Sequence, residues 1–180
     1  MTPGATPPYF GQWESPALIG AIISGTYRAE DDPAWAASGA ESPADYARWA
    51  DHLCGVACLR MALAARGITP PPARDLARVL TRHGAYVEEP NGFIRGLIYA
   101  PAITWLAEAH GMRAEIILDR TAEAVLPLLA HGGLFIASVH PAIRRPTEAA
   151  PGKGGHLVLV FGAEEGALRL HNPSGHDAPS

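Results

Sequence analysis

Apolar residues recur at every third or fourth position in several segments of this chain, which is the spacing of a helix that buries one face. The clearest segment covers 54–66, ends at Gly67, and has Asp51 as its expected N-terminal cap. A second helix is predicted over 42–49, where Ser42 is the cap and Pro43 opens the first turn. The same criteria predict further helices over 16–24, 74–82, 101–110 and 121–130.

Short runs rich in β-branched residues predict strands in the second half of the chain. The runs 156–161 and 167–171 flank the turn sequence Gly-Ala-Glu-Glu-Gly and indicate an antiparallel hairpin. Further strands are expected over 115–118 and 134–139, and the proline-containing stretch 140–155 is predicted to be a long loop. Because helices come first and strands last, the order indicates an α+β fold.

Composition and charge narrow the class of protein. Of the 180 residues, 48% are hydrophobic and 18% are charged, so one globular domain over 1–180 is expected, with 1–8 as a flexible arm. The net charge of −4, with scattered basic residues, excludes the basic surface that nucleic-acid binding needs. No apolar run is long enough for a membrane helix, and the first residues lack the pattern of a secretory signal. We therefore expect a soluble, cytoplasmic protein without a membrane partner.

The two cysteines differ in their expected roles. Cys54 and Cys58 lie four residues apart on the predicted helix, where their side chains run parallel, so no disulfide is expected. Cys54 falls in the first helical turn, where unpaired N–H groups and the helix dipole lower the pKa of a thiol. Gly55 beside it leaves room for a substrate backbone, whereas Cys58 is expected in the core.

The predicted hairpin brings two polar side chains together. If its strands pair symmetrically about Glu164, His156 lies opposite Asn172, close enough for the imidazole and the carboxamide to form a hydrogen bond. His171 points to the opposite face and is expected to be packed. A cysteine at a helix end, a histidine and a group that orients the histidine together form an activated nucleophile. The pattern therefore assigns Cys54 as nucleophile, His156 as general base and Asn172 as the orienting residue.

Two blocks, CGVACLRMAL and GGHLVLVFGAEEGALRLHNPSG, carry a family resemblance. They resemble the papain-like cysteine peptidases of the bacteriocin-leader-processing (double-glycine peptidase) type and their free-standing bacterial relatives, which more often have aspartate in place of Asn172. The resemblance implies a papain-like fold, with the nucleophile helix packed on a C-terminal antiparallel sheet. It also implies hydrolysis of a peptide bond in a peptide or protein substrate, such as a small peptide precursor.

The resemblance further implies a glutamine that stabilises the oxyanion. The usual position for this glutamine, six residues before the cysteine, holds Arg48. Gln12, in the segment PYFGQW, is the only glutamine in the chain and is assigned this role, with the backbone N–H of Cys54 as the second donor.

Several alternatives remain open. The same triad could transfer the acyl group to an amine, as in a transpeptidase or cyclase. A catalytically degenerate domain could bind a peptide without cutting it, which Arg48 and the short tail after Asn172 favour. Arg144, Arg145 and Lys153 form either a solvated loop or a flap that guides an acidic peptide to the site. A zinc site would have to combine the cysteines with His52, His171 and His176, a spacing that fits no zinc motif, so no metal or cofactor is expected.

Overall fold

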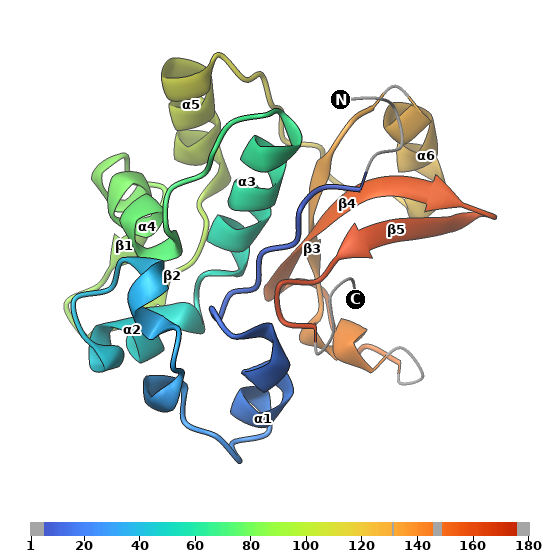
Figure 1. The fold of residues 1–180 in the computed structure, drawn as a ribbon. Helices are drawn as coiled ribbons and strands as arrows, with labels where there is room; N and C mark the ends of the chain where they lie inside the picture. The colour runs from blue at the N-terminus through green and yellow to red at the C-terminus, as the bar shows by residue number, and fades with distance from the viewer. Residues whose placement is uncertain (1–5, 131, 146–148, 176–180) are drawn as a thin grey trace.

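The computed structural model describes residues 6–130, 132–145 and 149–175. A group of helices lies on one side of the molecule and a three-stranded sheet on the other, and the N-terminal segment runs between α3 and the sheet (Figure 1). This arrangement confirms the α+β class. Most of the expected flexible arm, 1–5, and His176 lie outside the described residues.

The helices follow the predicted pattern closely. Their bounds are α1 (Ile19–Ile23), α2 (Pro43–Ala50), α3 (Cys54–Ala65), α4 (Ala73–Arg82), α5 (Tyr99–His110) and α6 (Ala122–Ala130). Short 3-10 helices cover Pro16–Leu18, Ala29–Asp31, Trp35–Ser38 and Pro141–Arg144, so the predicted loop after residue 140 begins with a helical turn. The Ser42 hydroxyl accepts a hydrogen bond from the Asp45 N–H, which confirms the predicted cap of α2.

The strands are β1 (Val87–Glu88), β2 (Ile94–Arg95), β3 (Phe135–Val139), β4 (His156–Glu164) and β5 (Ala167–His171). The small hairpin of β1 and β2 was not expected from the sequence. The strand predicted over 115–118 is wrong, because this segment forms no ladder with any strand in the described part of the chain.

The sheet has the antiparallel order β3-β4-β5, and β4 at its centre is covered on both faces. Leu157 and Leu159 pack against Cys58 and Met61 of α3. The intervening Val158 and Val160 lie on the opposite face, where Leu129 of α6 covers them. The alternation of side chains along one buried strand thus fixes the position of α3 relative to the sheet.

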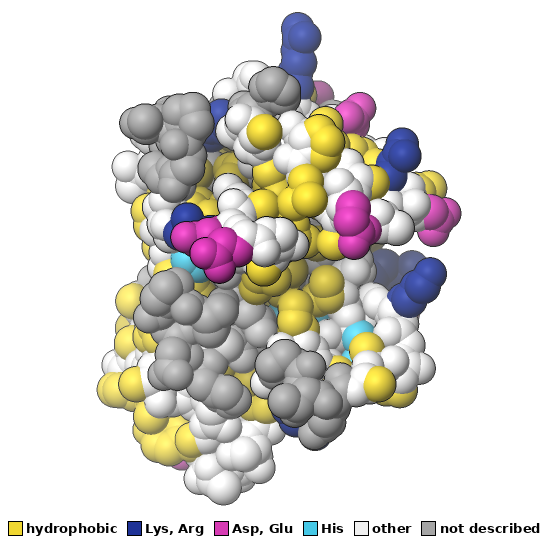
Figure 2. Space-filling model, turned by 90° about the vertical axis from the view of Figure 1, so that its right-hand side faces the viewer, with side chains coloured by type: hydrophobic (Ala, Val, Ile, Leu, Met, Phe, Trp, Pro, Cys, Tyr) yellow, Lys and Arg dark blue, Asp and Glu magenta, His cyan; other side chains and the backbone are white. Residues whose placement is uncertain are grey.

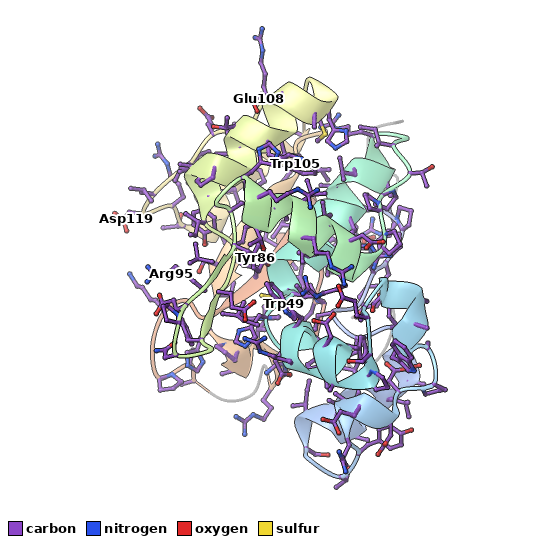
Figure 3. The ribbon with its side chains drawn as sticks, turned by 90° about the vertical axis from the view of Figure 1, so that its left-hand side faces the viewer. Trp49, Tyr86, Arg95, Trp105, Glu108 and Asp119 are labelled. Carbon is purple, nitrogen blue, oxygen red and sulfur yellow. The ribbon has the colours of Figure 1, made fainter. Side chains whose placement is uncertain are left out.

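Helices α2 to α5 surround a second apolar core, which includes Trp49, Tyr86 and Trp105. These three residues lie along the middle of the helical side, whereas Arg95, Glu108 and Asp119 lie at its rim (Figure 3). Tyr86 is fully buried.

The hairpin of β4 and β5 differs from the predicted symmetric pairing. Glu165 and Gly166 both have positive φ, 50° and 82°, and form a two-residue turn that pairs Glu164 with Ala167. A bulge between Val160 and Gly162 then shifts the register, so that Val160 pairs with Leu170. The bulge restores the parity that the turn changes, and His156 and Asn172 therefore still meet.

The segment after α5 lies against α6 and encloses a groove of about 510 Å³. Hydrophobic side chains gather on the face of the molecule that Figure 2 shows. Leu118 and Leu128, which line the groove, are 73% and 43% exposed. None of Cys54, His156 and Asn172 lines the groove.

Candidate active site

Cys54 is the first residue of α3, as the sequence predicts, but the expected cap of this helix is absent. Asp51 ends α2 instead, and the residue before Cys54, Leu53, makes no side-chain capping bond. Tyr86, in the neighbouring loop, takes over this function, because its hydroxyl donates to the carbonyl of His52 at 3.2 Å. The start of α3 is thus held by a tertiary contact rather than by a local one.

Gly55 has a different role from the expected one. The glycine is buried, and a Cβ at this position would lie 2.7 Å from the Leu97 Cβ and 2.9 Å from the Tyr86 hydroxyl oxygen. Glycine is therefore required by the packing of Leu97 and Tyr86 beneath the helix start. The expectation that Gly55 opens space for a substrate backbone is wrong.

His156 and Asn172 form the predicted hydrogen bond. The His156 Nε2 and the Asn172 Oδ1 are 2.7 Å apart, and both residues are buried. The same Oδ1 accepts the Ser174 N–H at 3.1 Å, which identifies this atom as the amide oxygen. Because an amide oxygen can only accept, the His156 Nε2 carries the hydrogen and its Nδ1 is left with a lone pair.

Ser174 joins this pair as a third member that the sequence did not indicate. Its hydroxyl oxygen lies 3.0 Å from the His156 Nε2 and 3.0 Å from the Asn172 Oδ1, and the residue has no exposed surface. It also accepts the Nε–H of Arg144 at 2.7 Å. Continuing the register of the Leu159–His171 pair brings Ser174 opposite His156, so the observed register could have indicated this contact.

The backbone of β4 links the two halves of the site. The backbone N–H of Leu157, the residue directly after His156, lowers the pKa of the Cys54 thiol and so lies near the sulfur. Cys54 also packs with Leu157 in the cluster between α3 and the sheet. The helix start and the strand start are therefore neighbours, which is the arrangement that the sequence pattern requires.

Burial has the largest effect on the ionisation of both residues. It raises the pKa of the Cys54 thiol, while the N–H groups of Leu157, Gly55 and Cys54 and the charge of Arg144 lower this pKa. It also lowers the pKa of His156, which the bond to Asn172 raises and the charge of Arg144 lowers. The expected lowering of the Cys54 pKa is therefore wrong in its net direction, because burial outweighs the helix end. Both shifts favour a neutral thiol and a neutral imidazole near pH 7.

Gln12 connects the N-terminal segment to both halves of the site. Its side-chain Nε2 donates to the carbonyl of Ala50, just before the turn that leads to Cys54, at 3.1 Å. Its backbone N–H donates to the carbonyl of Pro173 at 3.0 Å, and the Tyr9 hydroxyl donates to the carbonyl of Asn172 at 3.0 Å. The Gln12 Oε1 is buried and has no partner among the described residues. The amide thus lies beside the turn before Cys54, with one N–H directed at a backbone carbonyl.

The remaining candidates lie apart from this group or in the core. Arg48, at the usual glutamine position, is exposed and bonds to Glu88 at 2.5 Å. His171 is packed as expected, with its Nε2 bonded to the carbonyl of Pro7 at 2.8 Å, and Cys58 is fully buried. Among the described residues no group of three metal-ligating side chains could hold an ion, and His176 lies outside them.

Comparisons with known proteins give no family for the chain. No family model matches it, and no curated protein or solved structure matches it at a significant level. None of the helices in the described part of the chain has the length and apolar character to span a bilayer.

Proposed function

We propose that this protein is a cysteine peptidase of papain-like architecture, with Cys54 as nucleophile, His156 as general base and Asn172 as the residue that orients the imidazole. The observation that carries the proposal is the 2.7 Å bond from the His156 Nε2 to the Asn172 Oδ1, at the start of the strand whose next residue, Leu157, packs with Cys54. This bond leaves the Nδ1 as the basic atom of a buried imidazole.

The proposed reaction begins from a neutral pair. The His156 Nδ1 takes the thiol proton as the Cys54 sulfur attacks the carbonyl carbon of the substrate. The C–N bond then breaks, and the amine leaves with the proton that His156 donates. Water, deprotonated by His156, cleaves the thioester and releases a carboxylic acid, and the thiol regains its proton. Asn172 keeps the imidazole in the same tautomer during both steps.

Two donors are proposed for the oxyanion. The backbone N–H of Cys54 lies in the first turn of α3, where no residue of the helix accepts it. The Gln12 side chain has a second N–H besides the one that donates to Ala50. Loss of one such donor costs on the order of 10²–10³ in rate in acyl-transfer enzymes.

A pool of random peptides tests this proposal without knowledge of the natural substrate. Mass spectrometry of the products should detect new amino and carboxyl termini with the wild type but not with Cys54→Ala or His156→Ala. Cys58→Ala is the matched control, because it removes a thiol one helical turn away, and it should retain cleavage. Cleavage that persists in Cys54→Ala, or no cleavage by the wild type, would contradict the proposal.

One observation favours a second candidate, a peptide-binding domain without turnover. Burial raises the pKa of Cys54 and lowers that of His156, so the resting site holds no thiolate–imidazolium pair. For a binding domain, wild type and Cys54→Ala should retain the same peptides from the pool and release them uncut. Trapping of an acyl group on an added amine would instead indicate a transpeptidase.

A further inference from the structure

The side chain of Arg144, which the sequence places in either a solvated loop or a flap, contacts the buried polar group of the proposed site through Ser174. It lies at the end of the 3-10 helix Pro141–Arg144, which follows β3. Its Nε–H donates to the Ser174 hydroxyl, and this hydroxyl contacts both His156 and Asn172. One edge of the planar guanidinium is thereby fixed against the buried polar group, and the side chain is partly buried.

The charge of Arg144 acts on the reacting groups. It lowers the pKa of both Cys54 and His156, so both lie within its electrostatic range. Asp51 also interacts with it electrostatically, but the ion pairs found among the described residues use other arginines. A cation fixed beside a nucleophile, with no carboxylate at ion-pair distance in the described part of the chain, is suited to bind an anion.

We propose that Arg144 binds a carboxylate of the substrate next to the scissile bond, so that the preferred substrates are acidic peptides. This inference rests on the proposed function. In the proposed reaction His156 donates its proton to the leaving amine. Arg144 is linked to His156 by the Ser174 hydroxyl, which contacts both side chains. We therefore place the carboxylate on the leaving-group side of the scissile bond. The net charge of −4 repels anions at a distance, and a specific cation at the site is needed to reverse this repulsion locally.

Two alkylating reagents of similar size test the charge directly. Iodoacetate and iodoacetamide both form an S–C bond to the cysteine and release iodide, but only iodoacetate carries a carboxylate. The rate of alkylation of Cys54 by iodoacetate, divided by the rate with iodoacetamide, should fall roughly threefold to tenfold in Arg144→Gln. This is the range expected for loss of one opposite charge in a partly solvated site. Arg144→Lys should keep most of the ratio, since it keeps the charge. Arg145→Gln, the matched control, removes the same charge one residue further along and should leave the ratio within about twofold.

An unchanged ratio in Arg144→Gln, or an equal fall in Arg145→Gln, would overturn the inference. Should Arg144→Gln fail to fold, salt titration of the wild type decides: the iodoacetate rate should fall with added sodium chloride while the iodoacetamide rate stays constant. A constant ratio in that titration would equally overturn the inference. The iodoacetamide rate in His156→Ala reports on the proposed function alone, so the two failures are distinguishable.

The peptide pool tests the side on which the carboxylate binds. Among new amino termini produced by the wild type, Asp and Glu should be enriched in the first two positions, and Arg144→Gln should abolish the enrichment. Cleavage without acidic enrichment there would overturn this inference and leave the peptidase proposal standing.

Discussion

Removal of the Asn172 side chain should destabilise the protein and reveal its dependence on Ser174. Asn172→Ala deletes bonds to the His156 Nε2 at 2.7 Å, to the Ser174 N–H at 3.1 Å and to the Ser174 hydroxyl at 3.0 Å. The His156 Nε2–H keeps one acceptor, the Ser174 hydroxyl oxygen at 3.0 Å. We expect the free energy of unfolding to fall by about 1–3 kcal/mol, the cost of leaving buried polar groups incompletely bonded.

Ser174→Ala should lower the free energy of unfolding by a similar amount, because it removes the second acceptor of the His156 N–H and the acceptor of the Arg144 Nε–H. The two substitutions share a bond, so the double variant should differ from the sum of the single ones by at least about 0.5 kcal/mol. Urea unfolding at pH 7.5, followed by tryptophan fluorescence, measures all four states of this cycle.

The matched control is the exposed asparagine Asn91, whose Oδ1 accepts only the Phe93 N–H, at 2.9 Å, among the described contacts. Asn91→Ala should lower the free energy of unfolding by less than about 1 kcal/mol. The hydrogen-bonded group of His156, Asn172 and Ser174 would be contradicted by either of two results. One is a loss of unfolding free energy in Asn172→Ala no larger than in this control, and the other is additivity of the two site substitutions.

Two further predictions concern burial around the site. Burial lowers the pKa of His156 and of His171 below the usual 6.5, so below about pH 6.5 the unfolded chain binds more protons than the folded protein. The free energy of unfolding should therefore be constant above about pH 6.5 and fall as the pH drops from there through the lowered pKa values. Urea midpoints at pH 7.5 and pH 5 measure this change. Gly55→Ala should lower the free energy of unfolding by about 1–3 kcal/mol, because its Cβ would lie 2.7 Å from the Leu97 Cβ and 2.9 Å from the Tyr86 hydroxyl oxygen. A urea midpoint equal to that of the wild type would contradict this packing of the helix start.

The helices could be predicted from the sequence because their signals are local. Ser42 and Pro43 mark the start of α2, and the apolar spacing that begins at Cys54 defines α3. What supports α3 at its start could not be predicted, since Tyr86 lies more than thirty residues away in the chain and reaches His52 only in the folded protein. The strand expected over 115–118 failed for a similar reason, because a strand exists only where a partner pairs with it.

The candidate site, too, could be predicted only in the features that do not depend on detailed geometry. Side-chain alternation was enough to pair His156 with Asn172, because it depends on parity and not on the exact register. The register itself was wrong, since the two-residue turn at Glu165 and the bulge after Val160 both depend on local backbone geometry. Ser174 was missed for this reason, as it faces His156 only in the observed register.

The position of Arg144 and the direction in which the pKa of Cys54 is shifted both depend on the tertiary structure. In the sequence, Arg144 is one basic residue of a proline-containing loop, and only the folded chain brings it to Ser174. The helix end does lower the Cys54 pKa as expected, but the sequence gives no measure of how deeply the thiol is buried.

The rate at which iodoacetamide alkylates Cys54 at pH 7, compared between the wild type and His156→Ala, shows whether Cys54 and His156 act as one unit. Peptide mapping by mass spectrometry separates Cys54 from the fully buried Cys58, which serves as an internal reference. We expect Cys54 in the wild type to react at least about tenfold faster than in His156→Ala, because the imidazole takes up the thiol proton. Equal rates in the two proteins, or a rate at Cys54 no faster than at Cys58, would contradict this expectation.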